Sequence, residues 1–128
     1  MNAKTRMQGG IQTMTKIVPD DEMMSFDSGA IRGNKKTEKG RYDLLPWDAI
    51  HELAIHCAEG AAIYGERNCE KGIPVHSLID SAIRHLSCYL RGMKDEPHLR
   101  AALWNVAYAI WTEKHHPELQ DIPVRKVG

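Results

Sequence analysis

Acidic and imidazole side chains recur at helical spacing near the middle of the chain. Glu52, His56 and Glu59 are four and three positions apart, which places all three on one face of a helix. Carboxylates and imidazoles bind divalent metal ions, so this face is a candidate metal site with Glu52 and Glu59 as ligands. Glu59 is also a candidate catalytic residue. The alternative interpretation is a solvated helix face without a ligand.

A second group of the same residue types lies where a later helical pattern begins. Asp95, Glu96 and His98 fall just before that pattern and at its start. Acids in this position either bind a metal ion or cap the helix, and one side chain can do both. We expect Asp95, Glu96 and His98 to complete the metal site if the fold brings them to Glu52 and Glu59.

A third group combines an acid, an arginine and an imidazole. Asp80 and His85 are candidate catalytic residues because both can orient an attacking water. Arg84 is a candidate substrate ligand because its guanidinium fork matches phosphate oxygens. The alternative is that Asp80 and Arg84 form an exposed ion pair four positions apart, with His85 at the edge of the core.

Two polar connectors carry the positive charge that a polyphosphate requires. Residues 31–41 are rich in glycine and lysine, and residues 65–74 are polar with two glycines, so both are predicted loops. The candidate substrate ligands in these connectors are Lys35, Lys36, Lys39, Arg41, Arg67, Asn68 and Lys71. The alternative is a set of solvated loop charges.

Asn105 lies about two helical turns beyond His98, between Trp104 and Tyr108. A buried asparagine needs hydrogen-bond partners, so Asn105 either binds the edge of a nucleobase or bonds to neighbouring backbone. Trp104 and Tyr108 either stack on that base or pack in the core.

Three apolar patterns of helical period must position these side chains. They cover residues 47–64, 76–90 and 97–114, and prolines and glycines flank them. The apolar row expected to face the core from the first helix consists of Trp47, Ile50, Leu53, Ala54, Cys57 and Ala61. No segment alternates convincingly with period two, so the expected fold is all-α, a small helical bundle.

The domain organisation follows from these patterns. We expect a mobile N-terminal arm over residues 1–30, a helical domain over residues 31–117 and a loose C-terminal tail over residues 118–128. Exposed polar stripes on three short helices leave a thin core, which predicts a homo-oligomer.

The composition narrows the class of protein. The chain has 128 residues with 17 basic and 17 acidic side chains, and this balance argues against a binder of nucleic-acid polymers. No apolar run approaches the ~20 residues of a membrane span, and no secretory signal is recognisable. Three widely spaced cysteines without a CxxC motif indicate reduced thiols and a cytoplasmic location.

Four ordered motifs extend this picture from residue types to a family. They are Lys39-Gly-Arg-Tyr-Asp-Leu-Leu-Pro46, then Tyr64-Gly-Glu-Arg-Asn68 with Lys71-Gly72, then Asp80 with Arg84-His85-Leu86, and finally Pro97-His98-Leu99 with Trp104-Asn105. Over roughly residues 28–114, this set resembles a bacteriophage family described as the N-terminal domain of dATP/dGTP diphosphohydrolase, related in function to the phage MazZ enzymes.

The resemblance implies an all-α, MazG-like nucleotide pyrophosphohydrolase that uses Mg²⁺ or Mn²⁺. Such an enzyme cuts dGTP and dATP between the α- and β-phosphates and releases the deoxynucleoside monophosphate and pyrophosphate. The implied role, in the host cytoplasm, is to supply dGMP for synthesis of the 2-aminoadenine nucleotide dZTP and to deplete dATP.

Two further points qualify the expected site. The usual acidic signature of MazG enzymes, ExxE followed by ExxD on paired helices, is missing from the predicted helices, so the metal ligands must be other residues. The competing hypothesis is a non-catalytic, phage-encoded helical module that binds a nucleotide or a protein. That hypothesis predicts polar groups that stay scattered in the fold, whereas an enzyme must bring them together.

Overall fold

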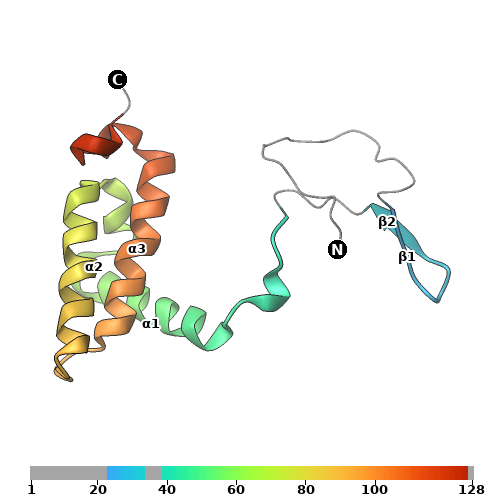
Figure 1. Ribbon diagram of the computed structural model, residues 1–128, viewed down its shortest axis with the longest axis horizontal. Helices are drawn as coiled ribbons and strands as arrows, with labels where there is room; N and C mark the ends of the chain where they lie inside the picture. The colour runs from blue at the N-terminus through green and yellow to red at the C-terminus, as the bar shows by residue number, and fades with distance from the viewer. Residues whose placement is uncertain (1–22, 34–38, 127–128) are drawn as a thin grey trace. The chain divides into compact units, whose positions relative to one another are not determined.

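The computed structural model describes residues 23–33 and 39–126 (Figure 1). The chain divides into two units, Met1–Leu45 and Pro46–Gly128. The second unit contains three α-helices, and the described residues outside it form only a small sheet and one short 3-10 helix. The predicted all-α fold, a small helical bundle, is therefore confirmed.

The first unit contains an antiparallel pair of strands that the sequence pattern did not reveal. Strand β1 (Met23–Ser25) pairs with β2 (Ile31–Gly33), and a 3-10 helix η2 (Tyr42–Leu44) follows. Strands of three residues are too short to produce a recognisable alternation of polar and apolar side chains. The part of the predicted arm before residue 23, together with Lys35 and Lys36, lies outside the described residues.

The three helices agree closely with the predicted segments. They are α1 (Trp47–Tyr64), α2 (Val75–Leu90) and α3 (His98–His115). Pro46 precedes α1, and Gly65 ends it with a φ of +98°, a conformation that side chains other than glycine rarely adopt. Local sequence signals therefore determine where each helix begins and ends.

Helices α2 and α3 form the core of the second unit and lie side by side (Figure 1). Val75, Leu78 and Ala109 form the buried cluster, with Trp104 and Tyr108 packed against it. Small side chains let the two helices approach closely, and the buried alanines between them are Ala82, Ala101, Ala102 and Ala109. The core is consequently narrow and contains few large side chains.

Helix α1 differs from the expectation that its apolar row faces the core. None of its residues is buried, and Trp47, Ala54 and Cys57 are exposed. The physical reason is that α1 packs mainly against α3, so no second helix surface encloses its apolar row. An amphipathic pattern predicts which face of a helix is apolar, but not how completely that face is covered.

The segment after α3 is ordered and folds back onto the start of α2, unlike the loose tail expected from composition. It forms two short 3-10 helices, η4 (Pro117–Leu119) and η5 (Pro123–Arg125), and Ile122 packs against the core cluster. Asp121 accepts a hydrogen bond from the backbone N–H of His76 at 2.9 Å, which satisfies a free donor at the start of α2.

Among the helices of the described residues, none combines the length and the hydropathy of a membrane-spanning segment.

Replacing Asp121 by asparagine should therefore lower the melting temperature by a few degrees at pH 7. The hydrogen bonds from the His76 backbone and side chain lower the pKa of Asp121 below its usual value near 4. This stabilisation is complete above the unfolded-state pKa and is lost as the pH falls through the lower folded-state pKa. The difference between Asp121→Asn and the parent should therefore shrink as the pH is lowered below about 4.

Thermal unfolding followed by circular dichroism at pH 7, 5 and 3 measures this difference. Glu66→Gln is the matched control, because the Glu66 side chain is exposed and makes no hydrogen bond with the described residues. An Asp121→Asn variant as stable as the parent at pH 7 would show that the contact with His76 contributes nothing.

Candidate functional site

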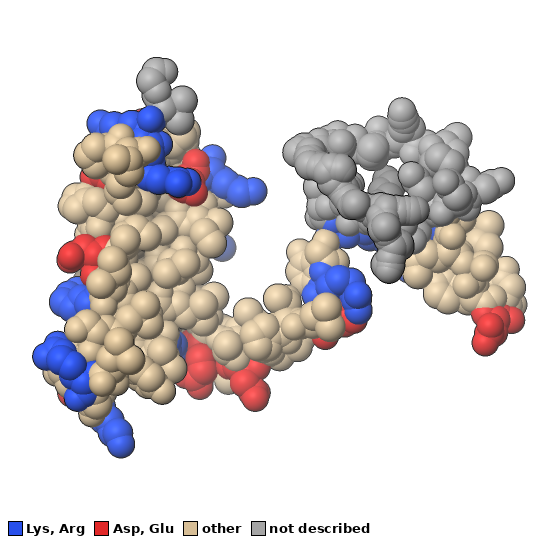
Figure 2. All heavy atoms as spheres, in the orientation of Figure 1, with Lys and Arg blue, Asp and Glu red and all other residues tan. Residues whose placement is uncertain are grey.

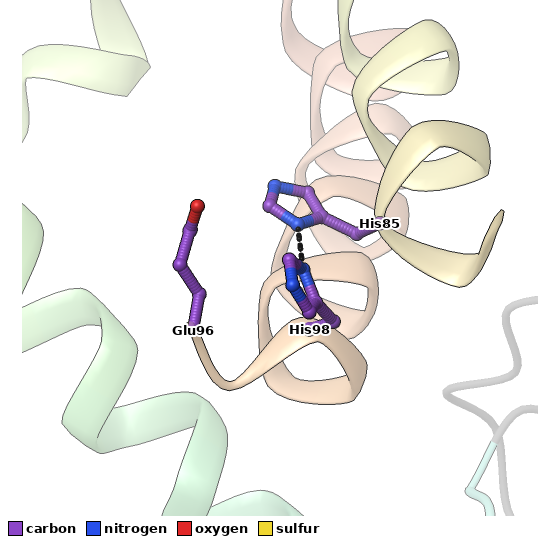
Figure 3. Close-up of side chains that lie close together, drawn as sticks. All are labelled: His85, Glu96 and His98. Atoms are coloured by element: carbon purple, nitrogen blue, oxygen red, sulfur yellow. Dashed lines mark hydrogen bonds between the residues drawn. The ribbon is translucent and has the colours of Figure 1, made fainter. Parts of the chain in front are cut away.

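Two imidazoles and a carboxylate converge where α2 ends and α3 begins (Figure 3). His85 comes from the last half of α2, His98 is the first residue of α3, and Glu96 lies in the turn between the helices. One potential ligand atom from each of the three residues lies within 4.8 Å of the others. The close packing of α2 and α3 brings together residues 13 positions apart.

The orientation of the His98 ring is fixed by Asp95. His98 Nε2 lies 2.9 Å from Asp95 Oδ1, and the hydrogen bond lowers the pKa of the Asp95 carboxyl, which favours a carboxylate. In a neutral imidazole one nitrogen carries the proton and the other a lone pair. Nε2–H therefore donates to Asp95, and the lone pair of His98 is on Nδ1, the atom that faces His85.

The His85 and His98 rings are spaced as neighbouring ligands of one metal ion would be. Their Nδ1 atoms are 2.9 Å apart, and His85 Nδ1–H donates to the lone pair of His98 Nδ1 (Figure 3). Two nitrogens each about 2.1 Å from an ion, at right angles to one another, are separated by about 3 Å. Burial, followed by the nearby Arg84, lowers the pKa of His85, which favours the neutral ring that a metal requires. A carboxylate behind a histidine, as Asp95 is, is also typical of metal-binding histidines.

Arg100 occupies the polar face of α1 that the sequence marks as a candidate metal site. Its guanidinium lies 2.6 Å from a Glu59 oxygen and 3.4 Å from a Glu52 oxygen, and its Nε donates to His56 Nδ1 at 3.3 Å. Burial, followed by Arg100, lowers the pKa of His56, consistent with a neutral ring that accepts this bond. Glu52 and Glu59 are thus paired with a cation rather than with Glu96 and His98.

A cavity of about 660 Å³ connects these two groups of polar residues. Glu52 and Arg100 line it together with the polar side chains at the start of α3, which are Asp95, Glu96 and His98. Apolar side chains, among them Tyr89, Met93 and Leu103, form the remaining wall. An arginine with a side chain only 11% exposed therefore faces the same space as a candidate metal group.

The structure does not bring the predicted catalytic residue Asp80 and the predicted substrate ligands Arg84 and Asn105 together in one site. The ion pair of Asp80 and Arg84, the alternative to a functional role, does not form, and the Arg84 guanidinium donates instead to Ser81 Oγ at 3.1 Å. Asp80 is exposed and lines neither of the two cavities beside α3. Asn105 is buried, and its Nδ2 donates to the Ala101 carbonyl at 2.9 Å, so its partner is backbone.

The candidate substrate ligands of the two predicted loops, residues 31–41 and 65–74, do not share one site in the structure. Arg67 and Asn68 line a second cavity, beside the middle of α3, whereas Lys71 is exposed and lines neither cavity. Arg41 makes two hydrogen bonds to Asp43, at 2.9 and 2.8 Å, within the first unit. Lys39 belongs to the same unit. Contact of Lys39 or Arg41 with a phosphate remains a prediction.

The matching family model is described as dATP/dGTP diphosphohydrolase, N-terminal, and it covers residues 30–122. The chain belongs to this family. Comparisons with curated proteins and with solved structures gave no match. The region that matches the family includes the helices, both cavities and the ordered C-terminal segment as far as Ile122.

Arg100 is the residue that sequence reasoning missed. It is 48 positions from Glu52 and 41 from Glu59, so no local spacing links them. The sequence did contain a usable signal. Positions 100, 104, 108 and 111 lie on one side of α3, and all of them except Arg100 are aromatic. A cation among aromatic residues indicates a contact with another element rather than a solvated position.

Removal of the Arg100 charge should loosen α1. Arg100→Met preserves much of the aliphatic length but leaves Glu52 and Glu59 without their cation. We expect amide hydrogen exchange in α1 to accelerate about threefold to tenfold, a moderate effect because both glutamates are half exposed.

Hydrogen exchange followed by mass spectrometry measures this effect peptide by peptide. Arg84→Met is the matched control, since the Arg84 guanidinium contacts Ser81 on its own helix. Equal exchange of α1 in both variants would mean that Arg100 does not hold this helix.

Proposed function

We propose that this protein hydrolyses dGTP and dATP to the deoxynucleoside monophosphate and pyrophosphate, with a divalent metal ion as cofactor. The family description supports the reaction class and the two substrates. The observation that carries the proposal is the convergence of His85, Glu96 and His98 beside a cavity that Arg100 also lines. The competing hypothesis of a non-catalytic module predicts polar groups that stay scattered, whereas these three converge.

The donor set fits a divalent ion and favours one of the two predicted metals. His85, Glu96 and His98 would hold the ion, with Asp95 fixing the His98 ring. Mg²⁺ prefers oxygen ligands, whereas a mixed set of imidazole and carboxylate suits transition metals, so Mn²⁺ fits better. When bound, the ion neutralises phosphate charge and makes a water molecule more acidic.

Arg100 is placed to bind the triphosphate. A guanidinium fork forms charge-assisted, bidentate hydrogen bonds with phosphate oxygens, and it retains its charge at any relevant pH. Stabilisation of the negative charge that develops on the leaving pyrophosphate lowers the reaction barrier. Glu52 and Glu59 then serve to position Arg100, which gives these two predicted residues a role different from metal binding.

The biological role follows from the family resemblance. The protein would act in the cytoplasm of a phage-infected cell, supplying dGMP for dZTP synthesis and lowering the dATP pool. Cleavage between the α- and β-phosphates is the step that yields dGMP directly.

Product analysis tests the proposed reaction. Purified protein with Mn²⁺ should convert dGTP to dGMP and pyrophosphate, and dATP to dAMP and pyrophosphate, with pyrimidine nucleotides cleaved at least about tenfold more slowly. Chromatography of the products distinguishes this outcome from release of tripolyphosphate, which would contradict the proposed mechanism.

Variants connect the activity to the site. His98→Ala should lower kcat/KM at least about a hundredfold and abolish Mn²⁺ binding measured by calorimetry, since a ligand is lost. Asp95→Asn should weaken Mn²⁺ binding about tenfold to a hundredfold because the His98 ring is no longer oriented. His51→Ala is the control, because His51 is exposed on α1 and lies outside the group. If the folded His98→Ala variant binds Mn²⁺ as the parent does, the metal site proposed at His85, Glu96 and His98 is wrong.

We also propose that two copies of the chain associate through an apolar face of α2 and α3. Large apolar side chains recur three and four positions apart on both helices, and those exposed on this face are Ile83, Leu86, Leu90, Leu99, Leu103, Val106 and Ile110. On each helix, the exposed apolar side chains lie about a quarter turn from the buried ones, in the same sense of rotation. Because α2 and α3 are antiparallel, this rotation places both sets of exposed apolar side chains on the same side of the helix pair. Figure 2 shows uncharged surface over α2 and α3 with charges toward its edges.

A second copy is the occupant that best explains this face. The narrow core of the helical unit leaves these large apolar side chains exposed on one face, and contiguous exposed apolar patches mark interaction sites. The face contains aliphatic side chains from both helices, so the same surface on another copy is complementary to it.

Val106→Glu should therefore convert the protein to a monomer. A charge in the centre of an apolar interface must be desolvated without a partner, which disfavours association. Light scattering coupled to size-exclusion chromatography measures the mass. Ile63→Glu is the matched control, because Ile63 is equally apolar and 71% exposed, but lies on α1. A parent protein that is already monomeric at micromolar concentration would exclude the association.

A further inference from the structure

A second cavity lies between the last half of α1 and the middle of α3. Its volume is about 650 Å³, within the range of small-molecule sites. One wall consists mostly of small side chains on α1, with Tyr64 at its end, and the opposite wall on α3 is aromatic. The residues of the two walls are Cys57, Ala58, Gly60, Ala61, Trp104 and Tyr108. We call this cavity the base slot.

The small side chains keep the base slot open. A Cβ atom built on Gly60 would meet nothing within 4 Å, so space exists beside this helix position. On the opposite side, the Trp104 and Tyr108 ring centroids are 4.8 Å apart with the ring planes tilted by 40°, so the wall is aromatic at both residues and each ring presents its own face. Aromatic faces bind flat, conjugated rings by stacking, and every nucleobase offers such a face.

Polar groups close one end of the base slot. The 3-10 helix η3 (Asn68–Lys71) lies there, and the Asn68 side chain makes no hydrogen bond with the described residues. A side-chain amide offers a donor and an acceptor side by side, which is the combination that the edge of a purine can match. The hydrogen bond to Cys69 and burial raise the pKa of Tyr108, so its hydroxyl keeps its proton.

The base slot follows the first cavity along α3. Arg100 lines the first cavity and Trp104 the second, and four residues of helix correspond to roughly 6 Å. His56 lies where the two cavities adjoin. It accepts a hydrogen bond from Arg100, and the centroid of its ring is 5.7 Å from that of Trp104. A molecule with phosphates at one end and a flat ring at the other fits this order.

We propose that the base slot binds the purine base of a deoxynucleotide, stacked on Trp104 and hydrogen-bonded at its edge by Asn68. This proposal rests on the proposed function, because that function places the triphosphate beside Arg100. Two aromatic rings along the wall offer more contact to a fused two-ring base than to a pyrimidine. In this proposal Asn68, rather than the buried Asn105, forms the hydrogen bonds with the edge of the base.

Binding of deoxyguanosine tests the base slot without requiring hydrolysis. Gly60→Leu should lower deoxyguanosine affinity at least tenfold by filling the slot, and it should fold well because leucine favours helix more than glycine. Ala62→Leu is the matched control, since Ala62 is exposed on the same helix and does not line the slot. Asn68→Ala should weaken deoxyguanosine binding about fivefold to tenfold. Titrations followed by nuclear magnetic resonance provide the dissociation constants.

Pyrophosphate binding and turnover separate the two proposals. Gly60→Leu should bind pyrophosphate as the parent does, and its KM for dGTP should rise at least tenfold. If Gly60→Leu is folded and binds deoxyguanosine normally, the base slot is overturned even when dGTP hydrolysis is found. If deoxyguanosine binding depends on Gly60 and Asn68 but no dNTP is hydrolysed, the base slot stands and the proposed function fails.

Discussion

One guanidinium holds α1 in its place on α3. In the described part of the chain, every side-chain hydrogen bond from α1 to another element goes to Arg100. A cation this deeply enclosed is tolerated only with partners, and Glu52, Glu59 and His56 provide them. Helix α1 contributes no buried residue, so this polar contact adds to what its half-buried apolar side chains contribute by packing. Both cavities depend on it, because each has one wall on α1 and another on α3.

The metal group depends on a different constraint, the close approach of α2 and α3. Alanines at positions 82, 101 and 102 let the backbones approach, and His85 and His98 are then buried side by side. Two buried imidazoles would be costly without partners, but here His85 Nδ1–H donates to the lone pair of His98 Nδ1, and Asp95 accepts from the far side of His98. An ion held by both Nδ1 atoms would take the place of the proton between them. These contacts hold the two rings close together without a ligand, which reduces the free-energy cost of binding one.

The sequence predicted the helices and the family well and the site only in part. Helix limits depend on local signals such as Pro46 and Gly65, and periodicity within one segment suffices to detect them. Convergence of His85 with His98, or of Arg100 with Glu59, depends on how helices pack, and no local pattern encodes that. Spacing grouped Glu52 and Glu59 as ligands because it could not reveal the cation that meets them. Asn105 was correctly expected to need a partner, which proved to be the Ala101 carbonyl.

The family match continues past α3 to residue 122 and so includes the first part of the ordered C-terminal segment. His116 Nε2 lies 2.9 Å from the Glu70 carbonyl, so this segment supports η3 and, through it, Asn68 at the end of the base slot. Gly72 lies against the same segment, because a Cβ atom there would lie 2.7 Å from Leu119 Cδ1, so the Leu119 side chain would have to move. Its φ of +114° also favours glycine. Residues far from either cavity in sequence thus contribute to the position of the predicted base ligand.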